Sequence, residues 1–127
     1  MARTNAGADF QAGVMGDTAS NGTGVYAAAN YMGVTANATA PVNTDTALAG
    51  EVGGGSLARV QCAYAHTIGT SSYTLSNTFT SDQTITLAKI GIFNASSSGT
   101  MVFETLLNAV VSMITGDQCL IVETVDL

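Results

Sequence analysis

Residues 87–107, which read LAKIGIFNASSSGTMVFETLL, decide the fold. Two runs of apolar and β-branched residues flank a short polar connection, and such runs favour β-strands. The connection, residues 94–99, is rich in serine and ends in Gly99, which adopts a positive φ angle without strain and so predicts a tight turn. The stretch therefore predicts a β-hairpin, in which the isolated Gly91 marks a bulge or a close approach of two backbone segments.

The same stretch mixes Lys89, Asn94, serines and Glu104 near glycines, which raises the question of a chemical site. The serines lack the Gly-x-Ser-x-Gly elbow of a hydrolase. His66 is the only histidine, and the sequence offers it no evident nucleophile or set of metal ligands. We therefore expect no enzymatic activity, and we interpret the polar connection as a candidate contact surface.

Alternation of apolar and polar residues predicts two strands before this hairpin. Residues 59–67 and 73–80 both follow a two-residue period. Residues 68–72, which contain Gly69, predict a hairpin loop between them. In the first of these strands one face carries the following side chains: Val60, Cys62, Tyr64 and His66.

Three more segments complete the set of predicted strands: residues 84–93, 100–107 and 118–127. Residues 106–114 leave a short helix open as an alternative, although their β-branched side chains disfavour it. Several antiparallel strands separated by turns predict an all-β fold, either an antiparallel β-sandwich or a small barrel.

Residues 1–28 have few large apolar side chains among Ala, Gly, Asn, Thr and Ser. Such a segment cannot bury a core alone, so we expect an extended N-terminal arm over residues 1–28 and a β domain over residues 29–127. A helical turn fits residues 11–14, but three glycines between positions 7 and 16 oppose a long helix. The apolar anchors of the arm are candidate interface residues, and a frayed terminus is the alternative. These anchors are Phe10, Val14, Met15, Val25 and Tyr26.

A long loop is predicted for residues 37–56, where proline, asparagine, aspartate and a run of glycines interrupt any strand. A loop of this length inside a domain is usually an interaction surface or a functional segment, and residues 46–51 could hold a helical turn. Pro41, Asp45 and Leu48 are therefore candidate interface residues.

Charge is scarce in this chain of 127 residues: only 9% of them are charged, against about 25% in an average soluble protein. A surface with few charges lacks like-charge repulsion and suits permanent assembly, although an ordinary monomer with a Thr, Ser and Asn surface is the alternative. The net charge of −6, with Arg3, Arg59 and Lys89 as the only cations, argues against a nucleic-acid partner. No segment has the apolar length of a membrane span or of a signal peptide, so we expect no membrane partner and no cleaved leader.

Cys62 and Cys119 lie in separate predicted strands and could form one disulfide if those strands pair, but a free, buried thiol is the commoner arrangement. Calcium is a minor option, because Asp45 with Glu51, or Asp82 with Asp117, could meet in space, yet no loop has EF-hand spacing. We expect no cofactor.

Several short motifs follow one another in a set order over residues 30–127. A short strand comes first and is followed by an Ala-Pro-x-x-x-Asp-Thr-x-Leu loop. Next come a Leu-x-Arg strand, a Gly-x-Phe-Asn-Ala segment with a Ser/Gly turn, and a closing Gly-Asp. The residues at these positions are Ala40, Pro41, Asp45, Thr46, Leu48, Leu57, Arg59, Gly91, Phe93, Asn94, Ala95, Gly99, Gly116 and Asp117. In this order and spacing, the chain resembles a family of small virion proteins of tailed bacteriophages.

The resemblance implies a structural component on the exterior of the virion, assembled in the host cytoplasm and without enzymatic activity. One expected role is capsid decoration (cement), in which the N-terminal arm and the β domain bind the major capsid protein and stabilise the shell. The other is a minor tail, tail-tip or tail-fibre protein at the host-contacting end. Homo-oligomers, trimers among them, are common in such assemblies. A carbohydrate-binding sandwich is disfavoured because the chain has no Trp.

Overall fold

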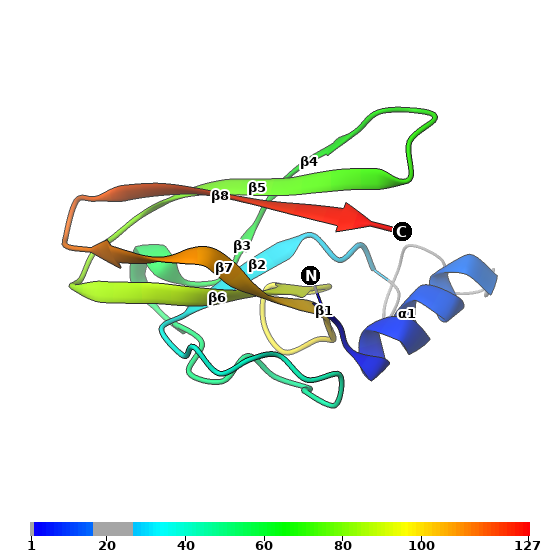
Figure 1. The fold of residues 1–127 in the computed structure, drawn as a ribbon, viewed down its shortest axis with the longest axis horizontal. Helices are drawn as coiled ribbons and strands as arrows, with labels where there is room; N and C mark the ends of the chain where they lie inside the picture. Colours follow the sequence, from blue (N-terminus) through cyan, green and yellow to red (C-terminus); the bar gives the residue numbers. More distant parts are fainter. Residues whose placement is uncertain (1, 17–26) are drawn as a thin grey trace.

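Two antiparallel β-sheets pack face to face in the computed structural model, which describes residues 2–16 and 27–127 (Figure 1). The first sheet has the strand order β1-β7-β6-β2-β3 and the second has the order β4-β5-β8. No strand in the described ranges closes the sheets into a barrel, so the sandwich alternative is confirmed. The elements in chain order are β1 (Ala2–Arg3), α1 (Asn5–Gly16), β2 (Tyr31–Thr35), a 3₁₀ turn (Gly55–Leu57), β3 (Val60–Gln61), β4 (Ala63–His66), β5 (Ser72–Thr80), β6 (Ile85–Phe93), β7 (Met101–Met113) and β8 (Gln118–Asp126).

The predicted hairpin is confirmed as β6 and β7, which pair antiparallel with Ile92 opposite Phe103. Gly99 takes a φ of 74° in the turn between them. Strand β7 continues to Met113, so the helical alternative for residues 106–114 is wrong. The pairing shifts register between Leu87 and Lys89, where residues 107–110 of β7 lie opposite Ala88 alone and interrupt the regular ladder.

One of the predicted strands is divided between the two sheets. Residues 59–67 were expected to form a single strand, but β3 belongs to the first sheet and β4 to the second. Cys62 alone separates them, and its backbone N–H donates to the carbonyl of Asn30 at 2.8 Å. The two-residue alternation runs on into β4, although all four residues of β4 are exposed, so the sequence pattern gives no sign of the crossing.

The core lies between the two sheets and draws side chains from both. Alternate positions of β2, β6 and β7 meet alternate positions of β5 and β8, as period-two burial requires. Its fully buried members include Met32, Val34, Leu57, Leu75, Phe79, Leu87, Ile90, Ile92 and Val125.

The long loop after β2 covers the outer face of the first sheet as a third layer. Leu48 is 4% exposed and packs with Phe93 and Met101 of the hairpin. Glu51 forms an isolated bridge with Thr35, and residues 46–51 contain turns rather than the helical turn that the sequence allowed. The loop is therefore part of the folded domain.

The start of the chain departs from the predicted extended arm. Residues 2–3 pair with β7, and α1 runs for 12 residues where only one helical turn was expected. Thr4 explains the helix start, because its hydroxyl accepts from the Gly7 N–H at 2.8 Å and donates to the Met101 carbonyl at 2.7 Å. Gly7 has no room for a side chain against the Val102 backbone, so a glycine that disfavours helices also permits this close packing.

None of the helices in the described ranges has the length and apolar character needed to cross a membrane.

Candidate functional site

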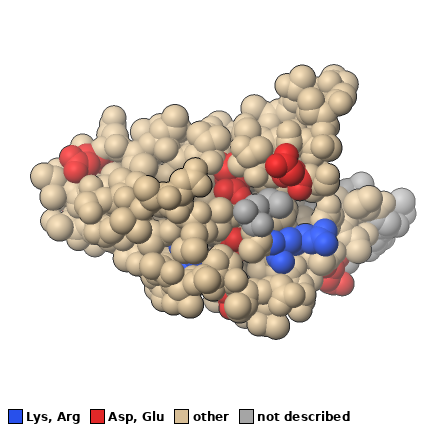
Figure 2. Space-filling view, in the orientation of Figure 1, with Lys and Arg blue, Asp and Glu red and all other residues tan. Residues whose placement is uncertain are grey.

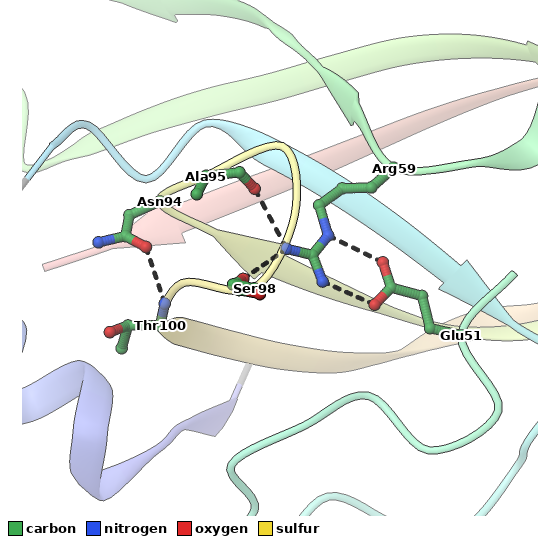
Figure 3. Close-up of polar contacts among 6 residues, drawn as sticks. All are labelled: Glu51, Arg59, Asn94, Ala95, Ser98 and Thr100. Carbon is green, nitrogen blue, oxygen red and sulfur yellow. Dashed lines mark hydrogen bonds and ion pairs between the residues drawn. The ribbon is translucent and has the colours of Figure 1, made fainter. Parts of the chain in front are cut away.

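Arg59 is the centre of a polar cluster that joins the long loop to the turn of the β6–β7 hairpin (Figure 3). Its Nε donates to Glu51 Oε2 at 2.9 Å and its Nη2 to Glu51 Oε1 at 2.7 Å, which is a two-pronged ion pair. Its Nη1 donates to the carbonyls of Ala95, at 3.1 Å, and Ser98, at 2.8 Å. The guanidinium also lies 3.4 Å from the centre of the Phe93 ring. One side chain thus holds two segments that are far apart in sequence.

The turn itself is closed by Asn94. Its side-chain oxygen accepts from the Thr100 N–H at 2.8 Å (Figure 3). Ser98 and Gly99 both have positive φ angles, 52° and 74°, which reverse the chain within the Ser-rich connection. The predicted contact surface is therefore a rigid turn, locked from one side by Asn94 and from the other by Arg59.

A shallow hollow of about 250 Å³ lies beside this cluster and is lined by residues 96–98 together with residues of the long loop. Arg59 lines it, but its charge is already matched by Glu51. Among the described residues that line the hollow there is no histidine, cysteine or second carboxylate, the groups that commonly activate a serine. His66 lies elsewhere, on exposed β4, with Nδ1 2.9 Å from the Ser72 carbonyl oxygen. The hydrogen bonds of the cluster hold the turn in place.

A second charged pair is buried under the long loop. Lys89 Nζ lies 2.9 Å from Glu104 Oε1 and donates to the Thr39 carbonyl at 3.0 Å, with side chains only 3% and 1% exposed. Burial raises the pKa of Glu104, and a hydrogen bond from Lys89 partly opposes that rise. The pKa of Asp45 is lowered, first by a hydrogen bond with Glu104 and then by the Val42 N–H. These groups fix the loop onto β6 and β7.

An apolar hollow of about 360 Å³ lies between α1 and the open end of the sandwich, and three predicted anchors meet there. Phe10 packs against the core, Val14 is half-buried, and Met15 is 81% exposed at the rim. The other wall comes from the ends of the strands and from the C-terminus: Ala28, Ala29, Tyr73, Val102, Phe103 and Leu127. We define these residues as the helix–sandwich hollow.

The remaining predicted interface residues lie in different environments. Leu48 is buried inside its own domain, because it fills the space between the loop and the hairpin, and it presents no surface to a partner. Asp45 is half-buried and holds the loop, and Pro41 is half-buried beside it. Val25 and Tyr26 lie outside the described residues.

The carboxylates considered for calcium do not gather. Glu51 pairs with Arg59, Asp82 accepts from the Ser56 N–H, and Asp117 accepts from the Ile114 N–H. Across residues 2–16 and 27–127 no group of three or more His, Cys, Asp or Glu side chains is arranged for a metal ion.

Both cysteines carry free thiols, so no disulfide links Cys62 to Cys119. Cys62 is buried, and its burial raises the pKa of the thiol to about 11. This cysteine therefore acts as a small apolar side chain at the crossing between the sheets.

Sequence reasoning missed two parts of these arrangements. Arg59 was noted as a motif position, yet nothing local indicates that it reaches a turn more than 35 residues away. Lys89 and Glu104 stood out as charges within apolar strands, and that feature is the one signal that could have predicted a buried ion pair.

Comparison with known proteins gives no match: no family model, no curated protein and no solved structure corresponds to this chain.

Proposed function

We propose that this chain is a structural protein of a tailed-bacteriophage virion and that it decorates the outside of the capsid. In this proposal the β-sandwich is the body, and the helix–sandwich hollow with α1 is the surface that binds the major capsid protein or a neighbouring virion protein. The protein stabilises the shell by binding only its assembled form, and no chemical reaction is involved.

The helix–sandwich hollow is the observation that supports this proposal most directly. It brings Phe10, Val14 and Met15, the anchors expected to contact a neighbour, to one apolar concavity. Exposed apolar concavities on folded domains commonly mark interaction sites. Met15, at 81% exposure, is the side chain best placed to enter a partner.

The distribution of charge agrees with permanent assembly. Of the three cations, Lys89 is buried against Glu104 and Arg59 is matched by Glu51, while Arg3 donates to Gln11 at 2.6 Å. Most of the surface in the view of Figure 2 is uncharged. Few charges would have to be desolvated when a partner covers such a surface, and no cluster of Lys and Arg is present for a phosphate backbone.

The motif positions of the resemblance add a second line of support. Arg59, Phe93, Asn94, Ala95 and Gly99 converge on the single cluster that fixes the hairpin turn. The order and spacing of these motif positions in the chain therefore have one structural cause.

Copy number in purified particles tests the proposal against its alternative. A decoration protein should give a band comparable to that of the major capsid protein in a stained gel, whereas a tail, tail-tip or fibre protein should give a faint one. A faint band, or a cryo-electron microscopy reconstruction that locates the chain on the tail, would replace capsid decoration with the tail role.

The binding surface has its own test. Met15→Asp should weaken binding to particles by about 10- to 100-fold, because burying an apolar side chain of this size contributes about 1.5–3 kcal/mol. Ile114→Asp is the matched control: that side chain is 60% exposed and lies in the β7–β8 connection, at the end of the molecule opposite α1 (Figure 1). Equal loss of binding in both variants would reject the hollow as the docking surface. Point variants are preferable to deletion of residues 1–28, since Thr4 and Gly7 pack into the domain.

A further inference from the structure

Strand β8 is an open edge of the second sheet. It pairs with β5 along its whole length, from Gln118 opposite Thr80 to Asp126 opposite Ser72, without a register shift. On its other side no strand within residues 2–16 and 27–127 pairs with it. Alternate backbone N–H and C=O groups of β8 therefore point away from the sheet and lack a strand partner there.

This edge lacks most of the features that protect natural edges from pairing. Protected edges are short, bulged, interrupted by proline or lysine, or carry an inward-pointing charge, and of these β8 has only the inward-pointing Glu123. Strand β8 has 9 residues, no proline and no lysine, and its outer face exposes Leu120 at 63% and Val122 at 51%. The neighbouring edge of the first sheet is different, because β7 bulges where it passes residue 88 of β6 and pairs with β1 at Phe103 and Glu104.

A groove borders β8 on the side of β7. A groove of about 220 Å³ separates its open side from the bulged part of β7. Glu123 faces into this groove region and accepts a hydrogen bond from the Thr105 hydroxyl at 2.9 Å, so its carboxylate is held inside its own chain. An incoming strand would meet backbone groups and apolar side chains rather than a free charge.

We propose that β8 pairs antiparallel with β8 of a second copy of this chain, centred on Val122. Antiparallel pairing of identical strands has two-fold symmetry, so it closes at two copies. It would join the two three-stranded sheets into one continuous sheet across the dimer.

The side chains of β8 are self-complementary in this register. Val122 faces Val122, Leu120 faces Thr124, and Gln118 faces Asp126. The pairing matches all nine residues of β8 and places apolar side chains together at the centre. At both ends of the paired strands an amide faces a carboxylate, so no two like charges are directly opposite. This arrangement favours a second copy of β8 over an unrelated acidic strand.

The expected contact is large enough for a reversible dimer. Nine paired residues span about 30 Å, and two layers about 10 Å apart give a total buried area on the order of 1,200 Å². Such an area lies at the lower end of specific interfaces, so association should depend on concentration in the micromolar range.

Sedimentation equilibrium of the isolated chain tests the proposal without any virion component. The mass should rise from 12.8 kDa toward twice that value as the concentration increases. Val122→Lys places two lysines opposite each other and should raise the concentration of half-dimerisation at least 10-fold. Thr78→Lys is the control, because it adds the same charge to an exposed position on the same sheet face, one strand in from the edge. Circular dichroism should show that both variants keep the wild-type fold.

Charge complementation tests the register. Val122→Lys and Val122→Glu should each be monomeric, and their equimolar mixture should form a heterodimer because the two side chains then attract. A wild-type chain that stays monomeric at millimolar concentration would overturn the proposal, as would a trimer or an equal effect of Val122→Lys and Thr78→Lys. If the wild-type chain is monomeric and its Val122→Lys variant loses binding to particles, the edge binds another protein. That result would also overturn the proposed dimer.

Discussion

Replacing Arg59 with alanine removes a side chain that joins the long loop to the hairpin turn, and we expect the free energy of unfolding to fall by about 3 kcal/mol. Loss of one partner from a fully buried ion pair costs about 3–5 kcal/mol. The side chains of Arg59 and Glu51 are 11% and 20% exposed, so water screens the remaining carboxylate and about 2 kcal/mol is the better figure. The two carbonyl acceptors and the Phe93 ring contribute about 1 kcal/mol more.

Two further variants separate these contributions. Arg59→Lys keeps the charge but loses the planar fork and the stacking on the ring, so it should cost about 1.5–2 kcal/mol. A double-mutant cycle with Glu51→Gln should give a coupling energy of about 2 kcal/mol, since both side chains serve the same ion pair.

Urea denaturation followed by far-ultraviolet circular dichroism measures these changes, because the chain has no Trp for fluorescence. Arg3→Ala is the matched control: Arg3 is exposed and donates to the half-buried Gln11, so the change should stay within about 0.5 kcal/mol. A loss below 1 kcal/mol for Arg59→Ala, with an unchanged urea dependence, would refute the role of Arg59 as a clamp.

Three other predictions concern protonation, packing and thiol reactivity. Because burial raises the folded-state pKa of Glu104 and Glu123 above the ordinary value of 4.5, the native state retains protons that the unfolded chain releases. The free energy of unfolding should then fall as pH rises from 4.5 through those raised values, and glutamine at either position should flatten the slope, as urea titrations at several pH values will show. Gly7→Ala should push α1 away from β7 and lower the melting temperature by several degrees in a thermal scan; an unchanged temperature would contradict the close packing. At pH 8 a thiol reagent should modify Cys119 quickly and Cys62 only on unfolding, because the Cys62 pKa is about 11; equal rates by mass spectrometry would disprove its burial.

Local patterns predicted most of the sheet structure. Alternation and β-branched residues identified β5, β6 and β8, and the Ser/Gly connection identified the turn of the hairpin. These features depend on neighbours close in sequence, where periodicity is a direct record of burial.

Tertiary contacts decided the features that the sequence did not predict. Helix α1 forms despite three glycines because Thr4 caps its start and one of the glycines contacts β7. Likewise, Lys89 and Glu104 are buried because the long loop covers them, and each supplies the charge that the other needs. Intrinsic propensity is a weak guide wherever such contacts outweigh it.

The crossing at Cys62 restricts how the chain can vary in length. Because a single residue separates β3 from β4, an insertion of one residue there would turn every side chain of β4 to the opposite face and move Tyr64 away from its ring contact with Tyr73. The connection over residues 67–71 carries no such restriction, since it is exposed and joins strands that are already in register. Chains that build the same sandwich should therefore keep constant spacing across the crossing and tolerate insertions in the loop that follows.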